Sequence, residues 1–289
     1  MPQALVAGLR QALSDERLEL HGLEPVGGGC ISHAARARTS AGELFVKWND
    51  AVPPDLFLRE AEGLRALGEA GSGLVVPRVH GATSPGAQWP ALIVLEDLGP
   101  AGPYDEEALG RGLARLHGRT DASYGFPGPS YCGTTRQDNA PGASWPEFYR
   151  DRRLRPLLAL AERGPGLAGD AKRTYETLLA RVAQLLAHET SPSLVHGDLW
   201  SGNVLGSARG PALVDPACAH ADREYELGIT TLFGGFGARF FAAYEEEWPL
   251  PHGWRERNPL YQLYHLLNHY VLFGGAYGSQ ALRIARRFL

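Results

Sequence analysis

The chain has 289 residues, of which 44% are hydrophobic and 21% are charged, and its formal net charge at pH 7 is −4. This is the composition of a globular protein with enough residues for a large core. The charge leaves no electrostatic footprint for nucleic acid or anionic lipid, and no apolar run approaches the roughly 18 residues of a membrane span, so we expect neither partner.

The predicted elements of the first hundred residues make a small lobe with an antiparallel sheet. Leucines recur at helical spacing within residues 1–18, which predicts an amphipathic helix. Two strand-like runs within 23–49 flank a glycine turn, with a further turn at 41–42. Residues 57–70 have the period of the one main helix of this lobe, and the short apolar run 91–98 predicts a buried strand.

Helices dominate the rest of the chain. They are predicted within 104–120, 145–162, 170–188, 222–232, 236–246, 258–273 and 279–288. Glycine and proline cluster at 98–103, where the two parts join. We therefore predict an α+β fold of two lobes, an N-terminal lobe of residues 1–98 and a larger, mainly helical C-terminal lobe of residues 99–289.

The stretch LVHGDLWSGNVL, residues 194–205, carries the chemistry. Asp198 and Asn203 lie five positions apart, and Asp215 ends an apolar run twelve residues later. A buried carboxylate is costly without partners. Phosphoryl transfer uses one Asp to orient the attacking hydroxyl and take up its proton, while an Asn and a second Asp hold Mg²⁺. The spacing matches the catalytic and metal loops of protein kinases, with His196 at the position of their histidine.

A structural role is the simpler interpretation of each of these residues alone. Asp198 can form an Asx-turn, and Asn203 or Asp215 can cap a helix. The ordered set favours a kinase because upstream residues match as well. Lys47 lies on the strand after the glycine turn, and Glu60 lies on the following helix, where it can pair with the lysine.

The nucleotide is expected between the glycine turn and the run 91–98. Backbone N–H groups of the turn can approach phosphates, although a hairpin turn is the more usual meaning of a glycine triplet. The backbone at the end of the apolar run can bind adenine. The candidate nucleotide-binding residues are Gly27, Gly28, Gly29, Cys30, Ile31, Ser32, Lys47, Glu60, Glu96, Asp97 and Leu98.

At this point the sequence resembles the fructosamine kinase (ketosamine-3-kinase) family, within the aminoglycoside phosphotransferase and protein-kinase-like superfamily. The resemblance rests on GGGCIS, FVKWN, LVHGDLWSGNVL, ALVDPA, DREYELGITTLFGGF and YQLYHLLNHYVLFGG, which span residues 27 to 275. It implies a two-lobed kinase-like fold and ATP- and Mg²⁺-dependent phosphorylation of the 3-hydroxyl of ketosamines, a deglycation reaction. By matching positions, Asp198 is the catalytic base and Asn203 and Asp215 are the Mg²⁺ ligands.

The acceptor site is less well defined by the sequence. The candidate acceptor residues are His196, Trp200, Arg136, Gln137, Asn139, Glu224, His265 and His269. Trp200 can stack on a sugar or brace the loop from the core. His265 and His269 have metal-ligand spacing, but core histidines are the better interpretation. Glu224 either suits a helix dipole or touches the substrate amine. Arg136 departs from the family's usual Pro-Gln-x-Asn run and is predicted to contact a substrate carboxylate.

Other functions remain open at this stage. An aminoglycoside- or choline-type kinase would share the Asp-x4-Asn pattern, and a nucleotide-binding pseudokinase would share the fold. Cys30, Cys132 and Cys218 are too few for a disulfide framework, so a cytoplasmic location is expected. The protein is predicted to be a monomer, or a dimer linked through oxidised Cys30.

Overall fold

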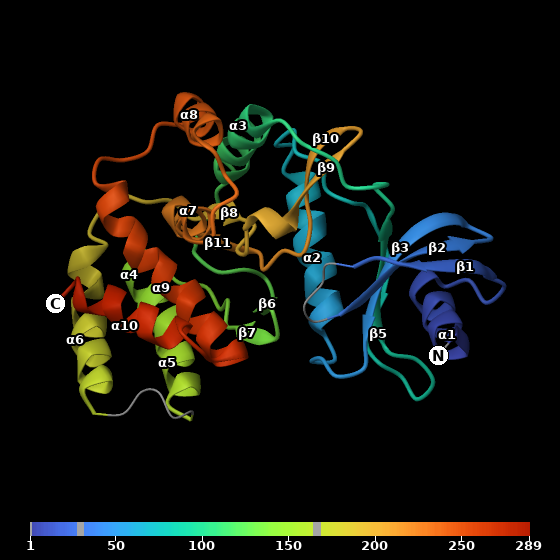
Figure 1. Ribbon diagram of the computed structural model, residues 1–289, viewed down its shortest axis with the longest axis horizontal. Helices are drawn as coiled ribbons and strands as arrows, with labels where there is room; N and C mark the ends of the chain where they lie inside the picture. Colours follow the sequence, from blue (N-terminus) through green and yellow to red (C-terminus); the bar gives the residue numbers. More distant parts are fainter. Residues whose placement is uncertain (1, 28–31, 164–168) are drawn as a thin grey trace.

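The structure is a computed structural model that describes residues 2–27, 32–163 and 169–289. It consists of two lobes side by side, with the N-terminus in the smaller lobe and the C-terminus at the far end of the larger one (Figure 1). A sheet-rich lobe precedes a mainly helical one, which confirms the predicted two-lobed α+β fold.

The smaller lobe is built on a five-stranded antiparallel sheet in the order β1-β2-β3-β5-β4. Its elements are α1 (Pro2–Leu13), β1 (Leu20–Pro25), β2 (His33–Thr39), β3 (Gly42–Asn49), α2 (Leu56–Glu69), β4 (Val79–Thr83) and β5 (Ala91–Glu96). The first helix is shorter than the predicted 1–18 because Ser14 adopts a left-handed φ of 52° and the chain turns there.

Strand β5 is apolar along its length because both of its faces are covered. Ala91, Ile93 and Leu95 pack in one core cluster with α2, whereas Leu92 and Val94 pack in another with α1. Successive side chains of a strand point to opposite faces, so α1 and α2 cover opposite faces of the sheet. The predicted buried strand is confirmed, and it ends at Glu96 rather than at residue 98.

The larger lobe surrounds its functional loops with helices. These are α3 (Glu106–His117), α4 (Trp145–Tyr149), α5 (Arg155–Ala161), α6 (Asp170–Leu185), α7 (Arg223–Leu232), α8 (Ala238–Glu247), α9 (Trp254–Phe273) and α10 (Tyr277–Arg286). Short strands lie between them: β6 (Ser130–Cys132), β7 (Thr135–Gln137), β8 (Ser193–Val195), β9 (Val204–Ser207), β10 (Gly210–Leu213) and β11 (Ala219–Ala221). The sequence prediction missed β6, β7 and β11, which are too short for a visible alternation.

One predicted helix, 145–162, is interrupted. A π-helical turn over Arg150–Leu154 separates α4 from α5. Pro156 is the second residue of α5, and it has no N–H to donate to the carbonyl four residues earlier. The wider turn accommodates the proline without ending the helical path.

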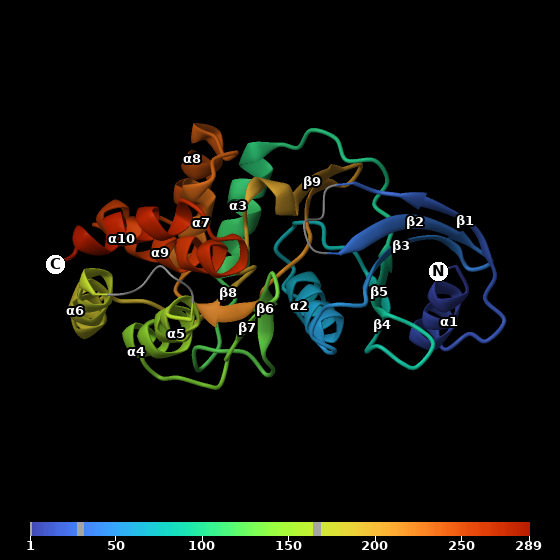
Figure 2. The ribbon, with the colours of Figure 1, turned by 60° about the horizontal axis from the view of Figure 1, so that its bottom comes forward.

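The two lobes contact each other through α2. Figure 2 shows this helix between the sheet and the β6–β7 hairpin. Its Gly63 carbonyl accepts a weak hydrogen bond from the Cys218 thiol (3.5 Å), and Val75, after the helix, forms a parallel β-bridge with Ala212 of the larger lobe. The predicted boundary at residue 98 stays a prediction, since residues before it already pack against the larger lobe.

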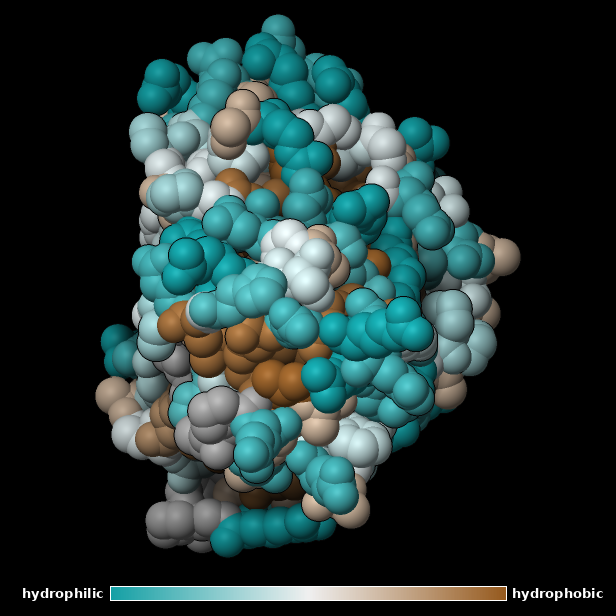
Figure 3. Space-filling view, turned by 90° about the vertical axis from the view of Figure 1, so that its right-hand side faces the viewer, coloured by the Kyte–Doolittle hydropathy of each residue, from teal (hydrophilic) through white to brown (hydrophobic). Residues whose placement is uncertain are grey.

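The end of the smaller lobe that faces away from the larger one is mostly hydrophilic, and the largest apolar area in this view lies just below its centre (Figure 3). Within the ranges that the structure describes, no helix combines the length and the apolar character that crossing a membrane requires.

The close approach of α2 to the larger lobe depends on Gly63. A Cβ at this position would lie 3.1 Å from Cys218 Sγ and 3.3 Å from Pro216 Cγ, whereas a Cβ at Gly68 of the same helix would meet only Val76, at 3.9 Å. We expect Gly63→Val to lower the free energy of unfolding by about 1–3 kcal/mol through overpacking. Urea denaturation measures this loss.

Gly68→Val is the matched control, because it makes the same change in the helix propensity of α2. It should alter the free energy of unfolding by less than roughly 0.5 kcal/mol. Equal effects of the two substitutions would contradict the proposed importance of the contact with Cys218.

Candidate active site

The predicted Asp-x4-Asn loop joins β8 to β9, and the following hairpin brings Asp215 back to it. Strands β9 and β10 pair antiparallel with Val204 opposite Leu213. Beyond this pair, the Val214 N–H donates to the Asn203 carbonyl (3.1 Å). The twelve residues between Asn203 and Asp215 therefore form one hairpin, which brings Asp215 back beside Asn203.

A buried carboxylate that the sequence prediction did not single out holds the loop backbone. Glu226 in α7 accepts hydrogen bonds from the N–H groups of His196 (2.5 Å) and Gly197 (3.0 Å). The ring of His196 is bonded to the carbonyl of Val214 through Nε2 (2.8 Å) and to the N–H of Asp198 through Nδ1 (3.3 Å). An imidazole with its proton on Nε2 satisfies both bonds, and burial lowers the pKa of His196, which favours this neutral form.

Gly197 occupies the position where the protein-kinase pattern has arginine. Its φ is 85°, and a Cβ there would lie 2.1 Å from the Ala217 carbonyl oxygen. A side chain at this position would therefore clash with backbone and also force an unfavourable dihedral. Glycine lets the loop pass against the segment that follows Asp215.

Asp198 is the predicted base, and its surroundings disfavour its charge. Its side chain is only 20% exposed. Burial raises the pKa of Asp198 to about 7, with the charges of Glu226 and Asp215 adding to the shift and polar contacts from Cys132 and Asn203 opposing it. A carboxyl group with a pKa near neutrality is suited to accept a proton from a hydroxyl and to release it again.

Lys47 bridges the two lobes. Its Nζ lies 2.8 Å from Glu60 Oε1 and 2.6 Å from Asp215 Oδ1. Burial alone would lower the pKa of Lys47, but Asp215 and Glu60 outweigh it and raise the pKa, so the ammonium is kept charged. The structure therefore brings together a lysine, a helix glutamate and an aspartate from three distant stretches. The sequence predicted the contact with Glu60 but not the one with Asp215.

The oxygens of Asn203 and Asp215 fit a hard divalent cation. Asn203 donates its amide N–H to the backbone carbonyl of Asp198 (2.8 Å), which leaves Oδ1 as the ligand atom. Asp215 is 43% exposed and has a left-handed φ of 58°. Such strain in a non-glycine residue costs on the order of 1 kcal/mol and is concentrated at functional sites.

The predicted adenine-binding hinge at the end of β5 stays a prediction. Glu96 and Asp97 are held by side chains, with Arg209 2.9 Å from Glu96 and Arg36 3.1 Å from Asp97. Leu98 follows them, and within the described ranges no group donates to or accepts from its backbone.

Part of the predicted phosphate-binding turn lies outside the described residues. These positions are Gly28, Gly29, Cys30 and Ile31. The flanking residues are described: Gly27 is exposed and Ser32 is half-buried. The predicted nucleotide roles of the turn and the predicted Cys30-linked dimer stay predictions.

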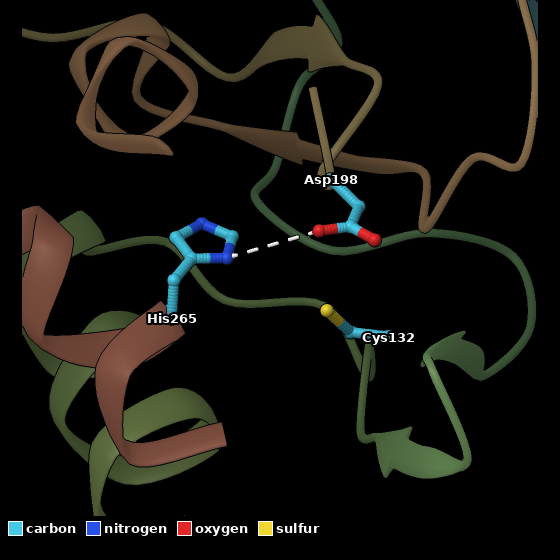
Figure 4. Close-up of side chains that lie close together, drawn as sticks. All are labelled: Cys132, Asp198 and His265. Atoms are coloured by element: carbon cyan, nitrogen blue, oxygen red, sulfur yellow. Dashed lines mark ion pairs between the residues drawn. The ribbon is translucent and has the colours of Figure 1, made fainter. Parts of the chain in front are cut away.

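Two predicted or newly found side chains lie close to the carboxylate of Asp198. His265 of α9 is fully buried and points its Nδ1 toward Asp198 Oδ1, 4.0 Å away (Figure 4). Cys132, at the end of β6, lies on the same side of Asp198 (Figure 4). Trp200, two residues after Asp198, is 36% exposed, so it is not a core residue, and its indole lies over Gly202 of the same loop.

Comparisons with known proteins identify the family of this chain. A model of the fructosamine kinase family matches residues 2–289. This chain belongs to the fructosamine kinase family. It is therefore a phosphotransferase that has an alcohol group as acceptor.

Relatives of this family member agree with the assignment. The chloroplastic protein-ribulosamine 3-kinase of Arabidopsis thaliana is 38% identical over 271 residues, which are 91% of this chain and 81% of the plant protein. A crystal structure from Thermobifida fusca with a provisional fructosamine-3-kinase name has a TM-score of 0.86 at 34% identity and covers 98% of both chains. The aminoglycoside phosphotransferase APH(4)-Ia, at 15% identity with a TM-score of 0.61 and coverage of 93% of this chain and 94% of its own, shares the kinase-like fold.

Two predicted acceptor residues of this family member are structural instead. Gln137 is buried between the Ser130 hydroxyl (2.6 Å) and the Tyr264 hydroxyl (2.6 Å). Asn139 is buried and accepts from Arg153 Nη2 (2.6 Å). Their polar atoms hold the β6–β7 hairpin in place, so the prediction of acceptor contacts is corrected for both.

The register of that hairpin also bears on Arg136. Cys132 pairs with Thr135 and Tyr131 pairs with Arg136. Paired residues share a face and neighbours in a strand alternate, so Arg136 lies on the face opposite Cys132 and Asp198. The predicted contact of Arg136 with a substrate carboxylate receives no support from this placement.

Three further candidates differ in their placement. Glu224 has both oxygens taken by Arg257 (2.6 and 2.8 Å), so it is an ion-pair partner and not an acceptor contact. His196 is fully buried and bonded to backbone, so it positions the loop. His269 is half-buried one turn beyond His265, with its Nδ1 2.8 Å from the carbonyl of that residue.

Glu226→Gln tests the support of the loop. The carboxylate accepts from the N–H groups of His196 and Gly197. The side-chain NH₂ of a glutamine would face one of these two groups, so two donors would meet. We expect the free energy of unfolding to fall by about 1–3 kcal/mol, and kcat to fall with little change in the KM for ATP. Urea denaturation and steady-state kinetics measure the two effects.

Glu256→Gln, an exposed carboxylate on α9, removes the same charge away from the loop and is expected to leave both quantities unchanged. A wild-type kcat in the Glu226 variant would show that this carboxylate does not position the loop.

Proposed function

We propose that this chain uses ATP and Mg²⁺ to phosphorylate the 3-hydroxyl of ketosamines, the adducts of sugars with amines. The observation that carries the proposal is the position of Asp198, a half-buried carboxylate with a pKa raised to about 7. It lies in the same loop as Asn203, the proposed cation ligand, and one hairpin away from the lysine-bound Asp215. The names of the ribulosamine 3-kinase relatives support the substrate class.

In this mechanism each residue has one task. Lys47 neutralises phosphate charge, while Glu60 holds the lysine in place on the sheet. Asn203 and Asp215 would hold the cation, which supplies charge neutralisation at the phosphates. Asp198 orients the sugar hydroxyl and takes its proton as the oxygen–phosphorus bond forms and ADP leaves.

The acceptor is proposed to lie between Asp198, Trp200 and His265. The exposed indole of Trp200 offers an apolar face to a sugar ring. His265 has a buried ring whose two nitrogens have no partner among the described residues, so a ligand hydroxyl would satisfy one of them.

An ATP-consumption assay with a substrate panel tests the function. Fructoselysine and ribuloselysine derivatives are expected to support ADP release, and an aminoglycoside and choline are not. Asp198→Asn should abolish the activity, and product analysis should place the phosphate on the 3-hydroxyl. A protein that binds ATP but phosphorylates no ketosamine would be a pseudokinase and would overturn the proposal.

The pH dependence follows from the raised pKa of Asp198. The carboxylate accepts the proton only in its ionised form, which predominates above its pKa of about 7. kcat/KM for the ketosamine should therefore fall as the pH drops, with an apparent pKa at or below about 7, since a bound cation favours ionisation. A pH profile at saturating ATP and Mg²⁺ measures this, and activity that rises toward acid would contradict Asp198 as the base.

Trp200→Phe tests the stacking contact. The smaller ring should raise the KM for the ketosamine by roughly threefold to tenfold, because part of the stacking energy is lost. The KM for ATP should not change. Trp89→Phe, at the β4–β5 turn of the other lobe, is the matched control, and a shift in the KM for ATP with Trp200→Phe would assign the indole to the nucleotide instead.

A further inference from the structure

Cys132, Asp198 and His265 form a cluster that the proposed phosphoryl transfer does not explain. They come from the end of β6, the catalytic loop and α9, and in each a potential metal-ligand atom faces the other two (Figure 4). These three atoms all lie within 4.8 Å of one another. A thiol, a carboxylate and an imidazole that converge in this way are the ligand types of zinc.

The imidazole of the cluster is unsatisfied. His265 is fully buried, and neither Nδ1 nor Nε2 has a hydrogen-bond partner among the described residues. Its ring packs between Tyr225 and Tyr264, with centroids 5.5 and 5.0 Å away, and its Nδ1 faces Asp198. Burial lowers the pKa of His265 to about 3, and a neutral imidazole is the form that binds a metal.

The thiol distinguishes this cluster from the proposed magnesium ligands. Asn203 and Asp215 offer only oxygen, which magnesium prefers, whereas a cysteine sulfur selects zinc and similar ions. Cys132 is buried, with Asn268 Nδ2 3.2 Å from its sulfur. Burial raises the pKa of Cys132, so its proton is lost to solvent only when a cation takes its place.

We propose that Cys132, Asp198 and His265 bind Zn²⁺, and that the bound ion blocks the acceptor hydroxyl from Asp198. Zinc–ligand bonds of 2.0–2.3 Å place tetrahedral ligands roughly 3.5 Å apart, so ligand atoms that lie within 4.8 Å of one another would approach by at most about 1.3 Å. The site leaves one zinc position for water. This inhibition rests on the proposed role of Asp198, but the binding of the metal does not.

A second group, with a histidine and two carboxylates, differs because other protein groups form hydrogen bonds with its side chains. His188, Asp222 and Glu224 also lie within ligand distance of one another. There, however, both oxygens of Glu224 accept from Arg257, and Asp222 accepts from the Tyr261 hydroxyl (2.6 Å). His188 Nε2 is itself bonded to Asp222 (2.8 Å). The atoms that would bind a metal in this group therefore already have protein partners, so we assign no metal to it.

Cobalt(II) is the probe for the site, because a cobalt–thiolate bond gives a charge-transfer band in the near ultraviolet. The full chain with Cys30→Ser and Cys218→Ser keeps Cys132 as its only thiol. Titration of this variant with Co²⁺ should produce the band at one equivalent, and Zn²⁺ should displace it. Adding Cys132→Ser should remove the band and weaken Zn²⁺ binding by more than roughly tenfold. Loss of a residue that only bonds to a metal ligand already costs about this much, and loss of the ligand itself costs more.

Kinetics give the second readout. In the protein with Cys132 as its only thiol, Zn²⁺ should raise the KM for the ketosamine without changing the KM for ATP, and a chelator should reverse the effect. The absence of a charge-transfer band in that protein would overturn the site, whatever its activity. Equal zinc affinity after Cys132→Ser would overturn it too, whereas a band in a protein that phosphorylates no ketosamine would leave the site standing and overturn only the proposed function.

Discussion

The ammonium group of Lys47 fixes the relation between the two lobes at the site. It projects from β3 of the smaller lobe and contacts Asp215 of the larger lobe at 2.6 Å and Glu60 of α2 at 2.8 Å. A buried ammonium is tolerated only with opposite charges around it, so each of the two carboxylates has a fixed place. The sheet, α2 and the β9–β10 hairpin meet at this one charge.

In the larger lobe, negative charges gather around Asp198. Glu226 holds the catalytic loop by its backbone, and its negative charge adds to that of Asp215 in raising the pKa of Asp198. The carboxylate that supports the loop thus also tunes the proposed base. A cation on Asn203 and Asp215 would reduce this repulsion, which links proton transfer to occupation of the nucleotide side.

Asp198 contacts residues of two proposed cation sites. Asn203, which donates to the Asp198 carbonyl, belongs to the proposed magnesium site, and the sulfur of Cys132 and the ring of His265 belong to the proposed zinc site. Hard and soft cations prefer different donors, so the proposed roles of Asp198 in catalysis and in zinc inhibition are compatible with each other. Both ring nitrogens of His265 lack a hydrogen-bond partner among the described residues, which favours a ligand-binding role over a purely structural one.

The sequence by itself determined the lobes, most of the helices and the order of the charged residues, because apolar periodicity and spacing along the chain are local properties. Lys47 and Glu60 could be paired in advance since kinase chemistry requires that combination, whereas the contact of Lys47 with Asp215 came from the structure. Only the tertiary structure decided which polar residues face the site: Gln137 and Asn139 turn into the hairpin, and Glu224 turns to Arg257. Glu226 and Cys132 emerged in the same way, because a side chain's partners depend on distant elements packed against it, and no pattern within its own segment encodes them.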